Sequence, residues 1–153
     1  MIVRRRLFRA AVLAVGALAL GVTAGCTGYS GTQAHQVTQW ASQYSVISND
    51  AIVIADVGAI RRSIKAARLL DVTSNCAGLV TDAGTAYGNL PTPDNTLTNE
   101  LNTAYQDFAN AGGICATATS LHAAKLFVAM KQIAVGVTAL ARAKLRLASD
   151  WVG

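Results

Sequence analysis

The chain has few of the residues from which catalytic and metal centres are built. Only two histidines and three cysteines occur among its 153 residues. Neither His35 nor His122 has a cysteine or carboxylate at the spacing of metal ligands, so we expect both to be solvated. The sequence also lacks a phosphate-binding loop, a dinucleotide fingerprint and an arrangement of serine, histidine and acid. We therefore predict that the protein is not an enzyme and holds neither a metal nor a cofactor.

Proline and strand-like alternation are also scarce. The only prolines are Pro91 and Pro93, and apolar residues recur at intervals of three and four instead of alternating. This spacing is typical of amphipathic helices and argues against a sheet as the main element. We expect an all-α fold.

The excess of positive charge is confined to the first residues. Thirteen basic residues against eight acidic ones give the chain a net charge of +5, but Arg4, Arg5, Arg6 and Arg9 supply four of the positive charges. The rest of the chain has nine basic and eight acidic residues, hence a net charge of +1. A nucleic-acid-binding domain would concentrate basic residues on one face of a strongly cationic domain. We therefore expect no nucleic-acid partner.

The N-terminus has the parts of an export signal. Its arginines are followed by the apolar stretch from Ala10 to Leu20, which is too short for a comfortable membrane span of about 20 residues. The segment Val22-Thr23-Ala24-Gly25-Cys26 then resembles the lipobox, at which bacterial lipoproteins are lipidated and cut. This resemblance implies that residues 1–25 are a cleaved signal peptide. It also implies that Cys26 carries a diacylglyceryl group and begins the mature protein.

The same resemblance predicts where the protein resides. Its location would be the extracytoplasmic face of the cell membrane, held there by the lipid. Residues 26–33 would form the lipidated tether and residues 34–153 one domain, for which the length is sufficient. Arg5-Arg6-Leu7-Phe8 also looks like the twin-arginine motif, whereas an ordinary basic region is the simpler interpretation, so the export route stays open.

The apolar spacing predicts four helices. The first is long, carries a stripe that shifts by one residue along its length, and is expected to bend near Gly58. The last is expected from Leu121 to Trp151. The stripes are Val37, Trp40, Tyr44, Ile47, Ala51 and Ile54, continued by Val53, Val57, Ile60 and Ile64; then Val72, Cys76, Leu79, Ala83 and Tyr87; then Leu97, Leu101, Ala104, Phe108, Gly112 and Cys115; and finally Leu126, Met130, Ile133, Val137, Leu140, Leu147 and Trp151. Four amphipathic helices with short connections favour an antiparallel up-down four-helix bundle.

A proline-containing turn separates the second and third predicted helices. Its sequence is Leu90-Pro91-Thr92-Pro93-Asp94. We expect Thr92 to be the N-cap of the third helix and Pro93 to occupy the first helical position. Asp94 would then complement the positive end of the helix dipole.

Cys76 and Cys115 lie on the apolar stripes of the second and third predicted helices. In antiparallel neighbours the start of one helix approaches the end of the other, so these cysteines can meet, and an oxidising compartment favours a disulfide. Cys115 lies further from the proline turn than Cys76 does, and an extended stretch from Asn89 to Asn95 would have to absorb the difference. The alternative is a pair of buried free thiols.

The arrangement of several of these features resembles a known kind of protein. Trp40, Cys76, the proline turn, Tyr105 and Cys115 follow one another as in small uncharacterised helical-bundle lipoproteins of high-GC Gram-positive bacteria. The resemblance implies an exported bundle with one disulfide, and it implies no catalytic residues.

Two groups of basic residues are candidates for surface contacts. Arg142, Lys144 and Arg146 come late in the last predicted helix, at the end of the bundle where the N-terminus and its lipid enter. We expect them to contact anionic headgroups of the membrane. A second group would lie at the far end of the bundle: Arg61, Arg62, Lys65 and Arg68. For both groups the alternative is an ordinary solvated helix face.

Asp50 and Lys144 each interrupt an apolar stripe. They could form a buried ion pair. A position at the helix edge, with the lysine stem lying along apolar surface, is the simpler interpretation.

Two functions remain after these exclusions. The leading hypothesis is a non-enzymatic interaction or structural module at the cell envelope, whose partners are the membrane and an unknown envelope protein. The alternative is a carrier that binds a lipid or other apolar ligand between its helices. A cavity of several hundred Å³ between the helices would favour the carrier, and a filled core the module.

Overall fold

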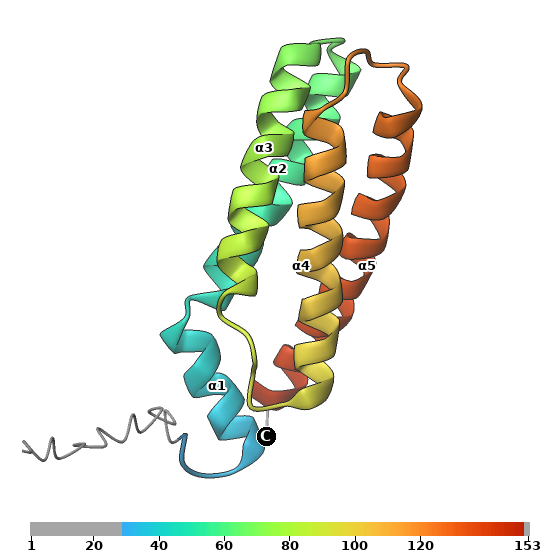
Figure 1. Ribbon diagram of the computed structural model, residues 1–153. Helices are drawn as coiled ribbons and strands as arrows, with labels where there is room; N and C mark the ends of the chain where they lie inside the picture. Colours follow the sequence, from blue (N-terminus) through green and yellow to red (C-terminus); the bar gives the residue numbers. More distant parts are fainter. Residues whose placement is uncertain (1–28, 152–153) are drawn as a thin grey trace, which may run out of the picture.

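The computed structural model describes residues 29–151. This part of the chain contains five helices and no strand, so the predicted all-α class is confirmed. The helices are α1 (Gln33–Gln43), α2 (Val46–Lys65), α3 (Leu69–Tyr87), α4 (Asn95–Ala116) and α5 (Ala124–Trp151). Figure 1 shows α2 to α5 side by side as four long helices, with the short α1 at one end. The predicted signal peptide (residues 1–25) and the proposed lipidation site at Cys26 lie outside the described residues.

Each long helix packs against the one that follows it in the chain. The contacts join α2 to α3, α3 to α4 and α4 to α5, whereas α2 and α5 have almost no close backbone approach. At one end of the molecule α1 touches both α5 and α2. The flanks of α2 and α5 are therefore the parts of the long helices that other helices cover least.

The interior is filled by one side of each long helix. Large apolar side chains are completely buried there, and alanines fill the positions where helices approach closely. The largest side chains in this core, each less than 2% exposed, are Trp40, Tyr105, Phe108, Ile60, Leu79, Leu97, Leu101, Ile133, Leu140, Val37, Val46 and Val53. They come from all five helices, so one core joins the whole described chain.

The prediction of one long first helix is wrong, because the chain breaks between α1 and α2. Ser45 adopts a left-handed conformation with φ of 50°, which a regular helix cannot contain. Asn49 spans the break by donating a side-chain hydrogen bond to the carbonyl of Tyr44, at 3.0 Å. At Gly58, where a bend was expected, α2 is not interrupted, and it continues to Lys65. The break occurs close to where the apolar stripe changes register.

The break turns α1 so that Trp40 packs near the end of α3. Trp40 is 1% exposed, and its indole nitrogen donates a hydrogen bond to the carbonyl of Asn89, at 3.0 Å. Its ring also lies against that of Tyr44, with centroids 6.2 Å apart. Figure 1 shows that α1 occupies the space beyond the end of α3, alongside the connection that leads to α4. The short helix thus closes one end of the core.

The predicted cap of α4 is wrong by two residues. Asp94, not Thr92, is the N-cap, because its carboxylate accepts a hydrogen bond from the backbone nitrogen of Leu97, at 2.9 Å. Pro93 consequently precedes the cap. Thr92 is buried and joins the turn, with its hydroxyl accepting from the backbone nitrogen of Asp94 at 3.0 Å.

The last helix starts three residues later than expected. Residues 117–123 form a loop, in which the backbone nitrogen of Ala123 donates to the carbonyl of Ser120. The helix α5 then begins at Ala124 and extends to Trp151. Leu121, the predicted first residue, lies in the loop and packs on the edge of the core.

Candidate functional site

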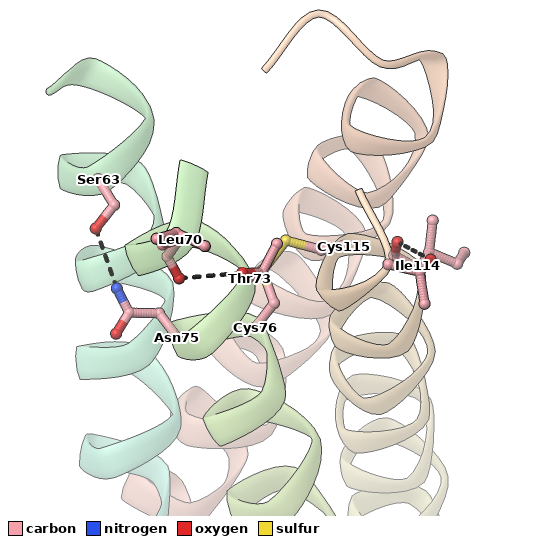
Figure 2. The surroundings of a disulfide bond; sticks show 8 residues. Ser63, Leu70, Thr73, Asn75, Cys76, Ile114 and Cys115 are labelled. Atoms are coloured by element: carbon pink, nitrogen blue, oxygen red, sulfur yellow. Dashed lines mark hydrogen bonds between the residues drawn. A yellow bond between two sulfur atoms is a disulfide. The ribbon is translucent and has the colours of Figure 1, made fainter. Parts of the chain in front are cut away.

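The structure brings Cys76 of α3 and Cys115 of α4 together in a disulfide. Their Cα atoms are 5.7 Å apart, within the range that this bond requires, and both residues are completely buried. Figure 2 shows the bond crossing between the two helices, near the end of the molecule opposite α1. The link encloses the whole turn between α3 and α4.

The connection between α3 and α4 explains how the two cysteines come level. Cys76 lies 11 residues, about 16 Å, before the end of α3, whereas Cys115 lies 20 residues, about 30 Å, after the start of α4. Residues 88–94 run along the molecule between these ends and can span about 24 Å when extended. Figure 1 shows α4 starting well beyond the point where α3 stops.

Gly112 permits the close approach of α3 and α4 beside the disulfide. A Cβ atom at this position would lie 2.8 Å from the carbonyl oxygen of Cys76 and 2.8 Å from Cγ2 of Val80. Gly113, the next residue, has no such neighbour within 4 Å. The helix contact is therefore specific to one of the two adjacent glycines.

The three basic residues predicted to contact the membrane have different environments. Arg146 is held by Asp94, with its Nε and one terminal nitrogen 2.9 Å and 2.7 Å from the same carboxylate oxygen. Arg142 and Lys144 are exposed. The end of α5 and the start of α1 lie at the same end of the molecule. Of the predicted group, Arg142 and Lys144 are thus the members whose side chains are mostly in solvent.

The contact between Asp94 and Arg146 joins the turn before α4 to the end of α5. Burial raises the pKa of Asp94, but hydrogen bonds from Arg146 and from the backbone nitrogen of Leu97 outweigh burial and hold this pKa below its usual range. Asp94 is 3% exposed. A buried carboxylate with these partners is ionised at neutral pH, and Arg146 supplies the opposite charge.

Asp50 is a second buried carboxylate. It is 1% exposed, and its Oδ1 accepts a hydrogen bond from the hydroxyl of Tyr105 on α4, at 2.7 Å. Its other oxygen, Oδ2, is buried with no hydrogen-bond partner. Burial raises the pKa of Asp50, while the Tyr105 hydroxyl and the positive charge of Lys144 lower it by less. Asp50 and Lys144 thus interact electrostatically, but no ion pair within 4 Å joins these two residues.

Surface hollows surround Ile47, where α1, α2 and the end of α5 meet. One hollow of about 210 Å³ is lined by Asp50, Lys144, Leu147 and Ala148 together with Ile47. A shallower one of about 470 Å³ continues along α1 and α2 and is lined by Ala41, Ser42, Ser45, Ile47, Ser48 and Ala51. Ile47 itself is 55% exposed. The region offers apolar surface with a lysine at its edge.

A further hollow lies at the opposite end of the molecule. Its volume is about 340 Å³, and its walls come from the end of α2, the loop before α5 and the first turns of α5. The lining residues are Ile64, Leu121, His122, Ala123, Leu126, Phe127 and Met130. Apolar side chains dominate this lining, and His122 is exposed at its edge.

Asp56 of α2 and Asp82 of α3 form a carboxylate pair that sequence reasoning did not bring together. Burial, then the hydrogen bond with Asp82 and the negative charge of Asp82, raise the pKa of Asp56 to about 6. The negative charge of Asp82 therefore opposes the ionisation of Asp56. Two aspartates 26 residues apart on different predicted helices carry no local sequence signal of such a contact.

Within residues 29–151, no group of three or more histidine, cysteine or acidic residues is placed to hold a metal ion. His35 is exposed near the start of α1, where its Nε2 lies 2.9 Å from the side-chain nitrogen of Gln39. The two histidines belong to opposite ends of the molecule. The structure therefore assembles no metal-ligand set from them.

The helix α5 combines a buried side with an apolar exposed side. By length and composition Ala124–Ser149 could cross a membrane, with a mean hydropathy of 1.4, and it is the one such helix in the described part of the chain. Its inner residues, including Ile133 and Leu140, are buried in the core. Because α5 packs against α4, its buried side is part of the core. This packing does not explain why the exposed side of α5 is also apolar.

Comparison with known proteins returns no match to a family model, to a curated protein or to a solved structure. Functional conclusions therefore depend on the chain itself.

Proposed function

We propose that the protein is an exported lipoprotein that serves as a non-enzymatic interaction module at the cell envelope. Its domain would be an antiparallel up-down bundle of α2, α3, α4 and α5, to which α1 is added, displayed on the extracytoplasmic face of the cell membrane. Cys26 would carry the lipid, and Thr27 to Thr32 would form the tether before α1. Arg142 and Lys144 would assist the anchor through contact with anionic headgroups.

The observation that carries this proposal is a filled core combined with apolar side chains on outward faces of the edge helices. Seven of the nine large apolar residues that are strongly exposed among the described residues lie on α2 and α5: Ile47, Ile52, Ile54, Phe127, Val128, Val135 and Leu145. Exposed apolar surface concentrated in this way is typical of interaction sites. No cluster of groups with an acid-base or nucleophilic arrangement competes with it in the described region.

Export and anchoring can be tested on intact cells. Thr81 lies exposed on α3, so a Thr81→Cys variant provides a reporter thiol away from the disulfide. We expect a membrane-impermeant maleimide to label this thiol in spheroplasts before lysis. We also expect the additional change Cys26→Ala to release the chain from the washed membrane fraction. Labelling only after lysis would contradict an extracytoplasmic location.

The carrier is the second candidate, favoured by the 340 Å³ hollow between the ends of α2 and α5. A carrier should bind a fluorescent fatty acid with saturable stoichiometry, and Ala123→Trp should abolish binding by filling the hollow. Ala77→Trp, an exposed change on α3, is the matched control. Equal and non-saturable signals from all three proteins would leave the interaction module as the function.

A further inference from the structure

The outward face of α5 is an amphipathic surface that the core does not use. We call the outer face of α5 the set Phe127, Val128, Lys131, Val135, Arg142 and Leu145. Successive members are one, three, four, seven and three residues apart, which places them on one side of the helix. The four apolar members are 51% to 74% exposed, and Lys131 and Arg142 are also exposed. Four large apolar side chains are thus kept in solvent on one helix.

Basic residues are concentrated on α5, the helix that carries this face, and acidic residues on α3 and α4. The helix α5 carries five basic residues and one acidic residue, Asp150, near its end. The helices α3 and α4 carry four acidic residues and no basic one. The domain is therefore positive along α5 and negative along α3 and α4. An anionic surface would attract the first side and repel the second.

Apolar and basic side chains also alternate along the outer face of α5 as at a lipid interface. The ammonium of Lys131 lies over the ring of Phe127, 4.7 Å from its centre, so the cation and the apolar ring are in contact on this face. A helix of this kind buries its apolar residues about 5–10 Å into the boundary between headgroups and acyl chains, with basic residues at the phosphates.

The position of the N-terminal end of the described chain bears on how a tethered domain would lie on a bilayer. The helix α1 packs against α5, and Thr32 caps its first turn. Thr32 lies six positions after Cys26, a reach of about 20 Å when extended. An anchor at Cys26 therefore leaves the chain close to α5. A domain tethered so near the bilayer can lie on its side.

We propose that the outer face of α5 binds the surface of a bilayer that contains anionic lipids, so that the domain lies flat with α3 and α4 turned away. This orientation rests on the proposed envelope location, which places the domain beside a bilayer. It deepens the expected headgroup contact from the end of α5 to the length of that helix.

The test measures the depth of two positions in the membrane. The full chain is purified from membranes as Val135→Cys or Thr81→Cys, labelled with an environment-sensitive fluorophore, and reconstituted into vesicles. These vesicles contain phosphatidylcholine with brominated acyl chains and about one third phosphatidylglycerol. We expect at least about a twofold quenching of the label at Val135 and none at Thr81 on α3. Equal quenching at both positions, or none at either, would overturn the proposal.

Charge variants test the role of the lipid headgroups. Lys131→Gln with Arg142→Gln should reduce quenching at Val135, and so should vesicles of brominated phosphatidylcholine alone. The matched change Arg61→Gln with Lys65→Gln removes two charges from α2 and should reduce quenching less. If the Val135 label is instead shielded without lipid, and Val135→Cys forms a disulfide with a second copy of the chain, the face is a dimer interface and the proposal is wrong.

The mass of the same preparations separates this proposal from the proposed function. Lipidated chain without quenching at Val135 would refute the flat orientation and leave the lipoprotein standing. Quenching at Val135 in a chain whose Cys26 carries no lipid would refute the lipoprotein and leave the bilayer contact standing.

Discussion

At the scale of single residues, two neighbouring glycines of α4 have opposite roles. Gly112 lies against the backbone of α3 beside the disulfide, and Gly113 faces open space. The sequence presents them as an equivalent pair. Only the position of α3 distinguishes them, which is information that depends on how the helices pack.

Replacing each glycine by alanine should change stability in opposite directions. Gly112→Ala should destabilise the protein by about 1–3 kcal/mol, because the new methyl group overlaps the carbonyl of Cys76, which is backbone and cannot turn away. Gly113→Ala should stabilise it by about 0.5–1 kcal/mol through higher helix propensity. Urea unfolding of both variants provides the measurement. A destabilised Gly113→Ala would show that the two positions are not distinguished as described.

The carboxylate pair of Asp56 and Asp82 should make stability depend on pH. The folded-state pKa of Asp56 is raised to about 6, so its contribution to stability is greatest below the unfolded pKa of 3.8 and is lost as pH rises toward 6. Asp56→Asn should therefore stabilise the protein at pH 7 by about 1 kcal/mol, after allowance for partial exposure and screening. Thermal unfolding of both proteins at pH values from about 4 to about 7 measures this difference.

A control separates this effect from a general loss of negative charge. Asp71 is an exposed residue of α3 whose carboxylate lies 3.7 Å from Arg68. Asp71→Asn should change stability by no more than about 0.5 kcal/mol at either pH. An equal gain in both variants would indicate that net charge, not the contact with Asp82, sets the pH dependence.

At the scale of elements, the break between α1 and α2 was only partly predictable from the spacing of apolar residues. The apolar stripe of the first predicted helix shifts by one residue, and this shift predicts a bend near Gly58 instead of a break. In the structure a left-handed residue, Ser45, ends the first helix, after which Val46 and Val53 enter the core instead of Ile47 and Ile54. Serine has no strong preference for this conformation, so residue type provided little indication of the position.

The turn before α4 also shows how far local sequence can predict a helix boundary. Threonine, proline and aspartate were recognised as capping residues, but two of them are possible N-caps. Asp94 becomes the cap because its second oxygen meets Arg146, which lies 52 residues later in the chain. Local sequence predicted the existence of the boundary, and a long-range contact decides its position.

Removing Arg146 should weaken the link between α5 and this turn. Arg146→Met should destabilise the protein by about 1–2 kcal/mol at pH 7, because the Asp94 carboxylate stays buried without its opposite charge. The lowered pKa of Asp94 makes its stabilisation present above the unfolded pKa and lost as pH falls through the folded value. The difference between variant and parent should consequently shrink in acid.

Thermal unfolding at neutral and strongly acidic pH tests this account of Arg146. Arg142→Met is the control, since Arg142 is exposed on the same helix, and its effect should stay within about 0.5 kcal/mol at both pH values. A loss of stability in Arg146→Met that does not diminish in acid would show that packing of the side chain, not its charge, is responsible.

At the scale of the whole molecule, the disulfide should stabilise the bundle by limiting the freedom of the unfolded chain. It closes a loop between residues separated by 39 positions, which corresponds to a stabilisation of about 2–4 kcal/mol. Cys76→Ala with Cys115→Ala should therefore unfold at lower urea concentration than the parent, without loss of helical signal in water. Equal midpoints for the two proteins would contradict this contribution.

The all-α class was predictable because nearly every apolar stripe had the helical spacing over many residues. Three of the four predicted helices exist with shifted ends, and the predicted first helix is divided into α1 and α2. The hollows around Ile47 and the pairing of Asp56 with Asp82 were not predictable, because they depend on which helices become neighbours. The assignment of export and lipidation depends on residues 1–26, which lie outside the described region, and so it stays a prediction.

Intact mass tests whether the protein is a lipid-anchored domain that contains one disulfide. The protein should be extracted from membranes and weighed with and without reduction, next to a Cys26→Ala variant. The account predicts a chain that begins at Cys26 with the mass of a diacylglyceryl group, lost in the variant. It also predicts a gain of about 2 Da when the bond between Cys76 and Cys115 is reduced. An unmodified chain that retains residues 1–25 would contradict the claim.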